Sequence, residues 1–220
     1  MEKRTMKQLT LLCTLTLTSI LSIGCATNRG IIDVRVPPAT INPSSGTLVA
    51  ITKVIDMREF QETPSEPSIP SLKGGEINDE TITSRAIARK RNGYGKALGD
   101  ILLPEGRTVE DLVRETAEKS LAEKGYVVVK DRSQYADALP VEIEIHQFWA
   151  WMIPGFWTLE LDFEAIITAS NETVFMSPGE KIRGHVALKT QAAGTGAWTN
   201  TINKGLEDLC EQIKSDIKTP

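Results

Sequence analysis

Regular alternation of apolar and polar residues between positions 141 and 167 constrains the fold of this chain more than any other feature. The apolar odd positions are Val141, Ile143, Ile145, Trp149, Trp151, Trp157, Leu159, Leu161, Phe163, Ala165 and Ile167. The polar even positions include Glu142, Glu144, His146, Glu160, Asp162 and Glu164. Because side chains alternate between the two faces of a strand, this pattern predicts two half-buried antiparallel strands.

The register of this hairpin follows from the same alternation. The two apolar faces coincide only if odd residues oppose odd residues, so the connecting loop must contain an odd number of residues. A two-residue turn would set apolar residues against acidic ones. We therefore expect a three-residue loop at 154–156, with His146 opposite Glu164 and Trp149 opposite Leu161.

A further strand and two helices are predicted around this hairpin. Positions 180–190 carry basic residues on one face, which favours pairing beside the acidic strand. Thr108 can cap a helix with an apolar stripe that Gly125 ends, and a short strand, 126–129, follows at once. A last helix with helical apolar spacing is expected to begin near Thr199 or Thr201 and to pack on the same face of the sheet.

The fold class predicted from these elements is α/β, built as an α+β two-layer sandwich. It has a mixed, mostly antiparallel sheet with two helices packed on one face. The first firm strand is predicted at 48–55. Residues 59–75, rich in Pro, Ser and Glu, are expected to form a mobile loop.

The segment 85–102 contains an Asn-Gly pair that favours a tight type I′ turn. With Asn92 and Gly93 as that turn, Arg91 would pair with Tyr94, Arg89 with Lys96 and Ile87 with Leu98. A phosphate-binding loop is the alternative for this run. It is disfavoured, because the glycine spacing and the strand-to-helix setting of such loops are missing.

The amino-terminal residues have the order of a secretory signal. Lys3, Arg4 and Lys7 precede an apolar run from Leu9 to Ile23, and Cys25 follows small residues. The run is too short and too polar to be a membrane-spanning helix. We interpret 1–24 as a lipoprotein signal peptide and Cys25 as the lipidation site; an ordinary signal peptide that happens to contain a cysteine is the alternative.

This interpretation divides the chain into three parts. Residues 1–24 are removed, residues 25–46 form a lipidated cysteine with a flexible tether, and residues 47–220 form a single periplasmic α/β domain. A flexible tether of twenty residues would hold the domain roughly 25 Å from the membrane. Among Gram-negative lipoproteins, the absence of Asp after the lipidated cysteine favours the outer membrane, and here Ala26 stands at that position.

Charge and cysteine content restrict the function further. The formal net charge is −4, and loss of the signal peptide makes the mature chain more acidic. An acidic chain lacks the basic footprint of nucleic-acid binding. Cys13 would leave with the signal peptide and Cys25 would carry lipid, so Cys210 has no partner for an internal disulfide. Its place on an apolar helical stripe predicts a buried, inert thiol.

Candidate catalytic groups are few. His146 and His185, with nearby carboxylates such as Glu142 and Glu144, could be imagined as a metal site or a hydrolase dyad. Alternate polar residues on any exposed strand give the same spacing, so a solvated charged face is the preferred interpretation. No nucleophile elbow, zinc-ligand spacing or dinucleotide-binding loop is present. We therefore expect a protein that is not an enzyme and that needs no metal or cofactor.

An aromatic cluster at the hairpin is the candidate interaction site. Its residues are Phe148, Trp149, Trp151, Met152, Phe156 and Trp157. Exposed Trp, Phe and Met mark interaction surfaces and membrane interfaces. The alternative is that the hydrophobic core extends into the turn.

The order of elements behind Cys25 resembles the YajG-like family of bacterial envelope lipoproteins. The resemblance covers Cys25 with its extended segment 31–38, the first strand running into Asp56-Met57-Arg58, and the helix-to-strand unit 108–129. It implies an outer-membrane lipoprotein of unassigned function, anchored by the lipid on Cys25. We expect a non-enzymatic binding or accessory protein with an envelope protein partner, in assembly or transport. A lipid- or glycan-binding module and an unrecognised hydrolase are the alternatives.

Overall fold

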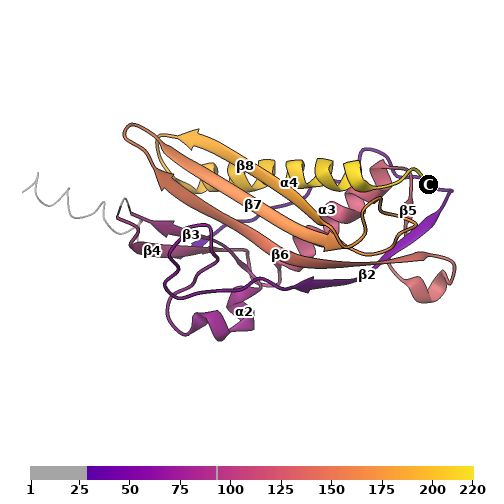
Figure 1. The fold of residues 1–220 in the computed structure, drawn as a ribbon, viewed down its shortest axis with the longest axis horizontal. Helices are drawn as coiled ribbons and strands as arrows, with labels where there is room; N and C mark the ends of the chain where they lie inside the picture. Colours follow the sequence, from indigo (N-terminus) through magenta and orange to yellow (C-terminus); the bar gives the residue numbers. More distant parts are fainter. Residues whose placement is uncertain (1–28, 93) are drawn as a thin grey trace, which may run out of the picture.

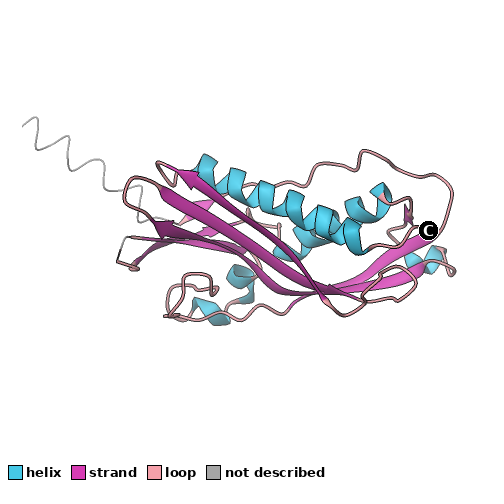
Figure 2. Ribbon diagram, turned by 45° about the horizontal axis from the view of Figure 1, so that its top comes forward, coloured by secondary structure: helices cyan, strands magenta, loops and turns pink. Residues whose placement is uncertain are grey.

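Eight strands of the described chain form one mixed sheet, and two long helices lie on one of its faces (Figures 1 and 2). The computed structural model describes residues 29–92 and 94–220. The strands are β1 (Gly30–Ile31), β2 (Leu48–Asp56), β3 (Ala86–Arg91), β4 (Ala97–Leu102), β5 (Val127–Val128), β6 (Leu139–Pro154), β7 (Leu159–Ala169) and β8 (Lys181–Thr190). The α-helices are α2 (Glu80–Thr83), α3 (Val109–Glu123) and α4 (Thr195–Asp216), with short 3-10 turns η1 (Glu76–Asn78) and η2 (Arg132–Gln134).

Strand β6 is the centre of the sheet. Its first half pairs in parallel with β2, and its second half meets β3 in parallel, where Ala150 lies opposite Ala88. Its other edge pairs antiparallel with β7, which pairs antiparallel with β8. Strand β4 extends the sheet beyond β3, and β1 runs parallel to β4. The α+β two-layer fold with a mixed sheet and two helices on one face is therefore confirmed.

Helix α3 begins and ends where the sequence predicts. Thr108 accepts a hydrogen bond from the Asp111 amide, and the Asp111 carboxylate accepts one from the Thr108 amide. This capping box satisfies amides that the first turn would otherwise leave free. After the helix, Gly125 takes a positive φ of 103°, a conformation that favours glycine.

Helix α4 starts at Thr195, earlier than the expected Thr199 or Thr201. Its first turn is held by tertiary contacts rather than by sequence signals. The Trp198 ring is buried in the main core, and its indole N–H donates to the Ala193 carbonyl oxygen at 3.1 Å. As expected, α4 shares the main core with α3 on the same sheet face.

The described part of the predicted tether, residues 29–46, lies against the domain, so the expectation of a flexible tether is wrong there. Strand β1 pairs with β4, and Ile32 and Val34 are buried in the main core. Farther along, the amide and hydroxyl of Thr40 both donate to the Glu123 carboxylate. The folded domain therefore begins near residue 30 and not at residue 47, the predicted boundary. The predicted signal peptide and Cys25 lie outside the described residues.

The hairpin of β3 and β4 forms with a wider turn than predicted. Arg91 pairs with Ala97 and Arg89 with Asp100, and the register of Ala86 and Ala88 places Ile87 near Ile101 and Leu102. The predicted pairs of Arg91 with Tyr94, of Arg89 with Lys96 and of Ile87 with Leu98 are therefore wrong. The Asn92 side chain accepts hydrogen bonds from the amides of Tyr94 and Lys96. These bonds stabilise a longer loop in which Gly95 supplies the positive φ.

The segment 59–75 is packed on the sheet, against the expectation of a mobile loop. It runs beneath the face opposite the long helices and carries a second hydrophobic cluster. That cluster contains Leu72, Ala86, Leu102, Trp149 and Trp151, with Phe60, Ile77 and Ile82 packed against it. We call residues 59–75 the strap.

Candidate functional site

The six aromatic and methionine residues of the predicted interaction site separate into three environments. Phe148 is buried in the main core, and Met152 packs against it. Trp149 and Trp151 are buried on the opposite face, in the second cluster. Phe156 and Trp157 are 88% and 86% exposed. Of the six predicted residues, only Phe156 and Trp157 are exposed, whereas Met152 is half-buried and the other three are buried.

A β-bulge at His146 causes this separation. The pairing of β6 with β7 shifts by one residue between Ile145 and Gln147, so His146 has no direct partner. Before the bulge, odd residues of β6 face the main core, and after it the even residues Phe148 and Ala150 do. The predicted pair of His146 with Glu164 is wrong because the bulge leaves His146 without a direct partner, and that of Trp149 with Leu161 is wrong because the turn after Pro154 sets a different register. Glu164 lies opposite Trp149.

The strap covers Trp149 and Trp151, which the bulge places on the face of the sheet opposite the main core. The Trp149 indole N–H donates to the Pro67 carbonyl oxygen at 3.3 Å, and the ring of Phe60 meets Trp149 edge-on at 5.9 Å. The amide of the Gln147 side chain donates to the Ser68 carbonyl oxygen at 2.7 Å. Burial of large aromatic rings on this face explains why a Pro-rich segment is ordered.

The β6–β7 turn presents the two exposed aromatic residues. The last strand pair is Pro154 with Leu159, so the loop has four residues instead of the predicted three. The Gly155 amide donates to the Thr158 carbonyl oxygen at 2.9 Å, and a Cβ on Gly155 would stand 2.5 Å from that oxygen. The rings of Phe156 and Trp157 meet edge-on at 4.8 Å. Glycine thus closes a turn that holds both rings outside the core.

A second turn lies beside this one. A surface hollow of about 450 Å³ has Arg91 at the end of β3 and Tyr94 and Gly95 of the β3–β4 turn on its wall, together with Met152 and Pro154 of β6. Tyr94 is 97% exposed, and Figure 1 shows both turns at the end of the sheet away from the carboxyl terminus. We call this region the aromatic end. Its exposed apolar side chains are Tyr94, Ile153, Phe156 and Trp157.

Cationic residues accompany the aromatic end. The stretch 90–96 contains Lys90, Arg91 and Lys96 and no carboxylate. The Arg91 guanidinium donates to the Gly95 carbonyl oxygen and to the Ser71 hydroxyl, both at 3.0 Å, which ties the turn to the strap. Burial, with a smaller effect of Arg89, lowers the pKa of Arg91. Tyr94 was not predicted as a surface residue, because the sequence pattern placed it in a strand pair. The cationic residues that flank Asn92 and Gly93 were the sequence feature that could have indicated an exposed turn.

The two histidines each lie near a carboxylate in partly exposed positions on the sheet. His146 Nε2 lies 3.2 Å from the Thr168 hydroxyl and 3.7 Å from Glu144, at the outer surface. His185 Nε2 lies 3.8 Å from Asp162, and burial raises the pKa of Asp162. Within residues 29–92 and 94–220, no three His, Cys, Asp or Glu side chains gather as a metal ion would require. The expected charge pairing of β7 with β8 is present, with Glu160 opposite Lys189 and an ion pair of Arg183 with Glu164.

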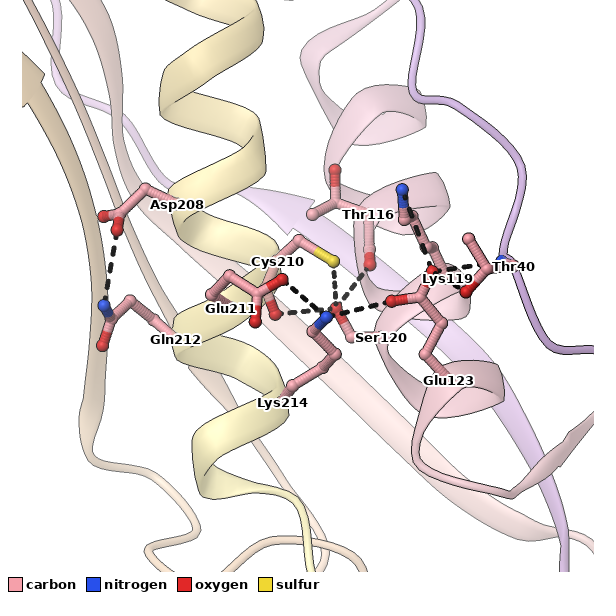
Figure 3. A network of polar contacts seen from close by, with 10 residues as sticks. All are labelled: Thr40, Thr116, Lys119, Ser120, Glu123, Asp208, Cys210, Glu211, Gln212 and Lys214. Atoms are coloured by element: carbon pink, nitrogen blue, oxygen red, sulfur yellow. Dashed lines mark hydrogen bonds and ion pairs between the residues drawn. The ribbon is translucent and has the colours of Figure 1, made fainter.

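Cys210 belongs to a polar network between α3, α4 and the amino-terminal segment (Figure 3). The Ser120 hydroxyl lies 3.2 Å from the Cys210 sulfur, and burial raises the pKa of the thiol. The ammonium group of Lys214 donates to the Glu123 carboxylate at 3.0 Å, and that carboxylate also accepts from Thr40. The thiol is buried, as predicted, and the network joins three segments of the chain.

No helix in the part of the chain that the structure describes is long and apolar enough to cross a membrane. Cys25, the predicted lipidation site, falls outside that part. No family model and no curated protein matches the sequence. Among the solved structures to which the chain is similar is one described as the crystal structure of an uncharacterized protein, at 11% sequence identity and a TM-score of 0.37. The match covers 86% of this chain and 97% of that one. A likeness at this level carries no argument about fold or function.

Proposed function

We propose that this protein is an outer-membrane lipoprotein, anchored through Cys25, which works as a non-enzymatic binding or accessory protein in envelope assembly or transport. The sequence order of a basic start, an apolar run and a cysteine supports the anchor. The resemblance of the element order to the YajG-like lipoproteins supports the periplasmic location. In this proposal the aromatic end is the binding surface.

The observation that carries the proposal is the exposure of Phe156 and Trp157. Large aromatic side chains at a surface lose little conformational entropy on binding and bury much apolar area, so they dominate many interfaces. Here they stand on a closed turn of the longest hairpin, whereas the aromatic residues Phe148, Trp149 and Trp151, farther back on β6, are buried. A folding role does not account for rings that touch chiefly each other.

A photo-reactive phenylalanine analogue placed at position 156 in the living envelope tests this proposal. We expect light to attach it to a defined envelope component. The same analogue at Tyr135 is the control, because Tyr135 is exposed near the opposite end of β6 and should give no such product. Identical products from both positions, or none from position 156, would contradict a binding role for the aromatic end.

The double variant Phe156→Ser, Trp157→Ser separates binding from folding. Both side chains are exposed, so the thermal midpoint should stay within about 2 °C of the wild type, as for substitutions that change stability by less than about 0.5 kcal/mol. Trp151→Ser is the contrasting variant. Its ring is buried under the strap, and its loss should lower the midpoint by many degrees.

A further inference from the structure

We infer that the aromatic end rests on the membrane that holds the anchor, with Phe156 and Trp157 among the lipid headgroups. The inference depends on the proposed lipidation of Cys25 and names the partner of the proposed binding surface, a phospholipid bilayer. Three observations carry it: the length of chain between Cys25 and the fold, the direction in which the fold begins, and the chemistry of the aromatic end.

The connection between Cys25 and the folded domain is short. Only residues 26–28 separate Cys25 from Arg29, the first described residue, and Gly30 already pairs with Ile101 of β4. Four Cα steps span at most about 14 Å when fully extended. A lipid on Cys25 would thus keep Arg29 within about 14 Å of the anchored cysteine, closer than the 25 Å expected for a long flexible tether.

The chain enters the fold from the side of the aromatic end. Because β1 runs parallel to β4, the residues before Gly30 approach from the side where β4 begins, at Ala97 beside the β3–β4 turn. Arg29 forms ion pairs with Asp100 and Glu76, and these hold the chain in place where it enters the fold. Ala97 lies four residues before Ile101, so the turn reaches about 13 Å beyond Gly30 toward the anchor. The β3–β4 turn therefore extends beyond Gly30 about as far as the chain between Arg29 and Cys25 can reach.

The β3–β4 turn and the β6–β7 turn both project toward the side from which the chain enters the fold. Strand β3 meets β6 in parallel, and the hollow between them joins Tyr94 and Gly95 to Met152 and Pro154. Figures 1 and 2 show the β3–β4 and β6–β7 turns together at one end of the molecule, with the carboxyl terminus at the other. An anchor beside Arg29 therefore brings this end to the bilayer first.

The side chains at this end have the chemistry of the bilayer interface. Trp and Tyr concentrate at the headgroup level, where an apolar ring and a polar tip are both satisfied. The cation Lys96, which is exposed on the β3–β4 turn, complements anionic headgroups, whereas Arg91 is held by Gly95 and Ser71. Acidic residues near this end include Glu66, exposed on the strap between two residues that line the hollow, Glu160, which lies opposite Lys189, and Glu62, which accepts a hydrogen bond from the Gly75 amide. A protein anchored by one lipidated residue binds the membrane more tightly, and in a defined orientation, when a second part of its surface also contacts the bilayer.

Quenching of tryptophan fluorescence by brominated lipid tests the inference. The full chain, processed by its own cell and purified, is reconstituted into vesicles of phosphatidylethanolamine and phosphatidylglycerol with or without brominated acyl chains. Trp149, Trp151 and Trp198 are buried in the protein, so they should escape the quencher, whereas Trp157 should lose at least half of its emission. Trp157→Phe should abolish the quenching and leave folding unchanged.

A matched control places an indole at the far end. In the Trp157→Phe background, Tyr135→Trp puts a tryptophan near the start of β6, about 50 Å from the β6–β7 turn at 3.3 Å per residue. No quenching is expected there. Equal quenching at both positions, or none at Trp157, overturns the inference.

The mass of the Cys25 peptide separates the two proposals. A diacylated peptide without quenching of Trp157 leaves the anchor in place and overturns the membrane contact alone. An unmodified Cys25 overturns the anchor and the membrane contact with it. Attachment of the analogue at position 156 to a protein, with Trp157 unquenched, assigns the aromatic end to a protein partner and overturns the inference.

Discussion

At the scale of single residues, the Arg58 side chain connects more segments of the structure than its place in the sequence indicates. Its guanidinium donates to the carbonyl oxygens of Ala86, Phe148 and Thr83, and it forms an ion pair with Asp56. Its charged group is fully enclosed. One side chain therefore joins the end of β2, the start of β3 and the middle of β6. It thereby fixes the position at which the strap begins. The segment Asp56-Met57-Arg58 is visible in the sequence, but its carbonyl partners are 25 to 90 residues away.

Replacing Arg58 with Met should lower the free energy of unfolding by about 3–5 kcal/mol, because three carbonyl oxygens, two of them buried, and a carboxylate lose their partner. Urea unfolding followed by circular dichroism measures it. Arg35→Met is the matched control, since the Arg35–Asp33 pair is solvent-exposed and should cost less than about 0.5 kcal/mol. Similar losses in both variants would show that Arg58 is not the organising group.

At the scale of elements, the close approach of α4 to β7 depends on a glycine. A Cβ on Gly205 would lie 2.0 Å from the ring of Phe163, which is buried in the main core. The ring has no free direction in which to move, because it also packs edge-on against Phe148 at 4.9 Å. The helix can therefore cover the sheet only with glycine at this point.

Gly205→Ala should lower the thermal midpoint by several degrees, because overpacking costs about 1–3 kcal/mol, more than the gain of about 1 kcal/mol in helix propensity. Scanning calorimetry measures the change. Gly196→Ala on the same helix has open space around its Cβ and should be neutral or stabilising. A Gly205→Ala protein as stable as Gly196→Ala would mean that α4 lies farther from the sheet.

At the scale of the whole molecule, the Glu123 carboxylate joins three distant segments. It accepts hydrogen bonds from Thr40 in the amino-terminal segment and from Lys214 on α4, while itself belonging to α3. Burial alone raises the pKa of Glu123, but the hydrogen bonds from Lys214 and Thr40 outweigh it and hold that pKa below its ordinary value. A carboxyl with a lowered pKa in the folded state stabilises the fold above its unfolded pKa, and this contribution disappears as the pH falls through the folded pKa.

Glu123→Gln should therefore reduce the free energy of unfolding by about 1–2 kcal/mol at pH 7, and the difference from wild type should shrink below about pH 4. Urea titrations at pH 7 and pH 3 give both values. Glu211→Gln, which removes a more exposed partner of the same Lys214, should change little. A difference that persists unchanged at pH 3 would exclude the charge of Glu123 as its source.

The strands and helices themselves could be predicted because local patterns specify them. The capping box at Thr108, the stop at Gly125 and the charge pairing of β7 with β8 are read from neighbouring residues. Alternation in β6 and β7 predicted a hairpin for the same reason. Each of these features depends on residues within a few positions or on a match between two faces.

The candidate site could be predicted only in part, because one inserted residue at His146 exchanges the faces of β6. Both faces after the bulge are apolar, so the sequence holds no contrast to reveal the exchange. Trp149 and Trp151 thus looked like partners of the main core, whereas the strap buries them on the other face. Exposure of Phe156 and Trp157 was consistent with the aromatic composition but not specified by it.

By itself, the sequence determined the fold class, the central hairpin and the helix limits of α3, because these follow from local periodicity and capping. Only the tertiary structure decided where the domain begins, what the strap covers and which aromatic residues remain outside. These depend on contacts across long stretches of chain, such as β1 beside β4 and Pro67 beside Trp149. Such contacts are selected by the total burial and hydrogen bonding of the folded chain, which no short window of sequence contains.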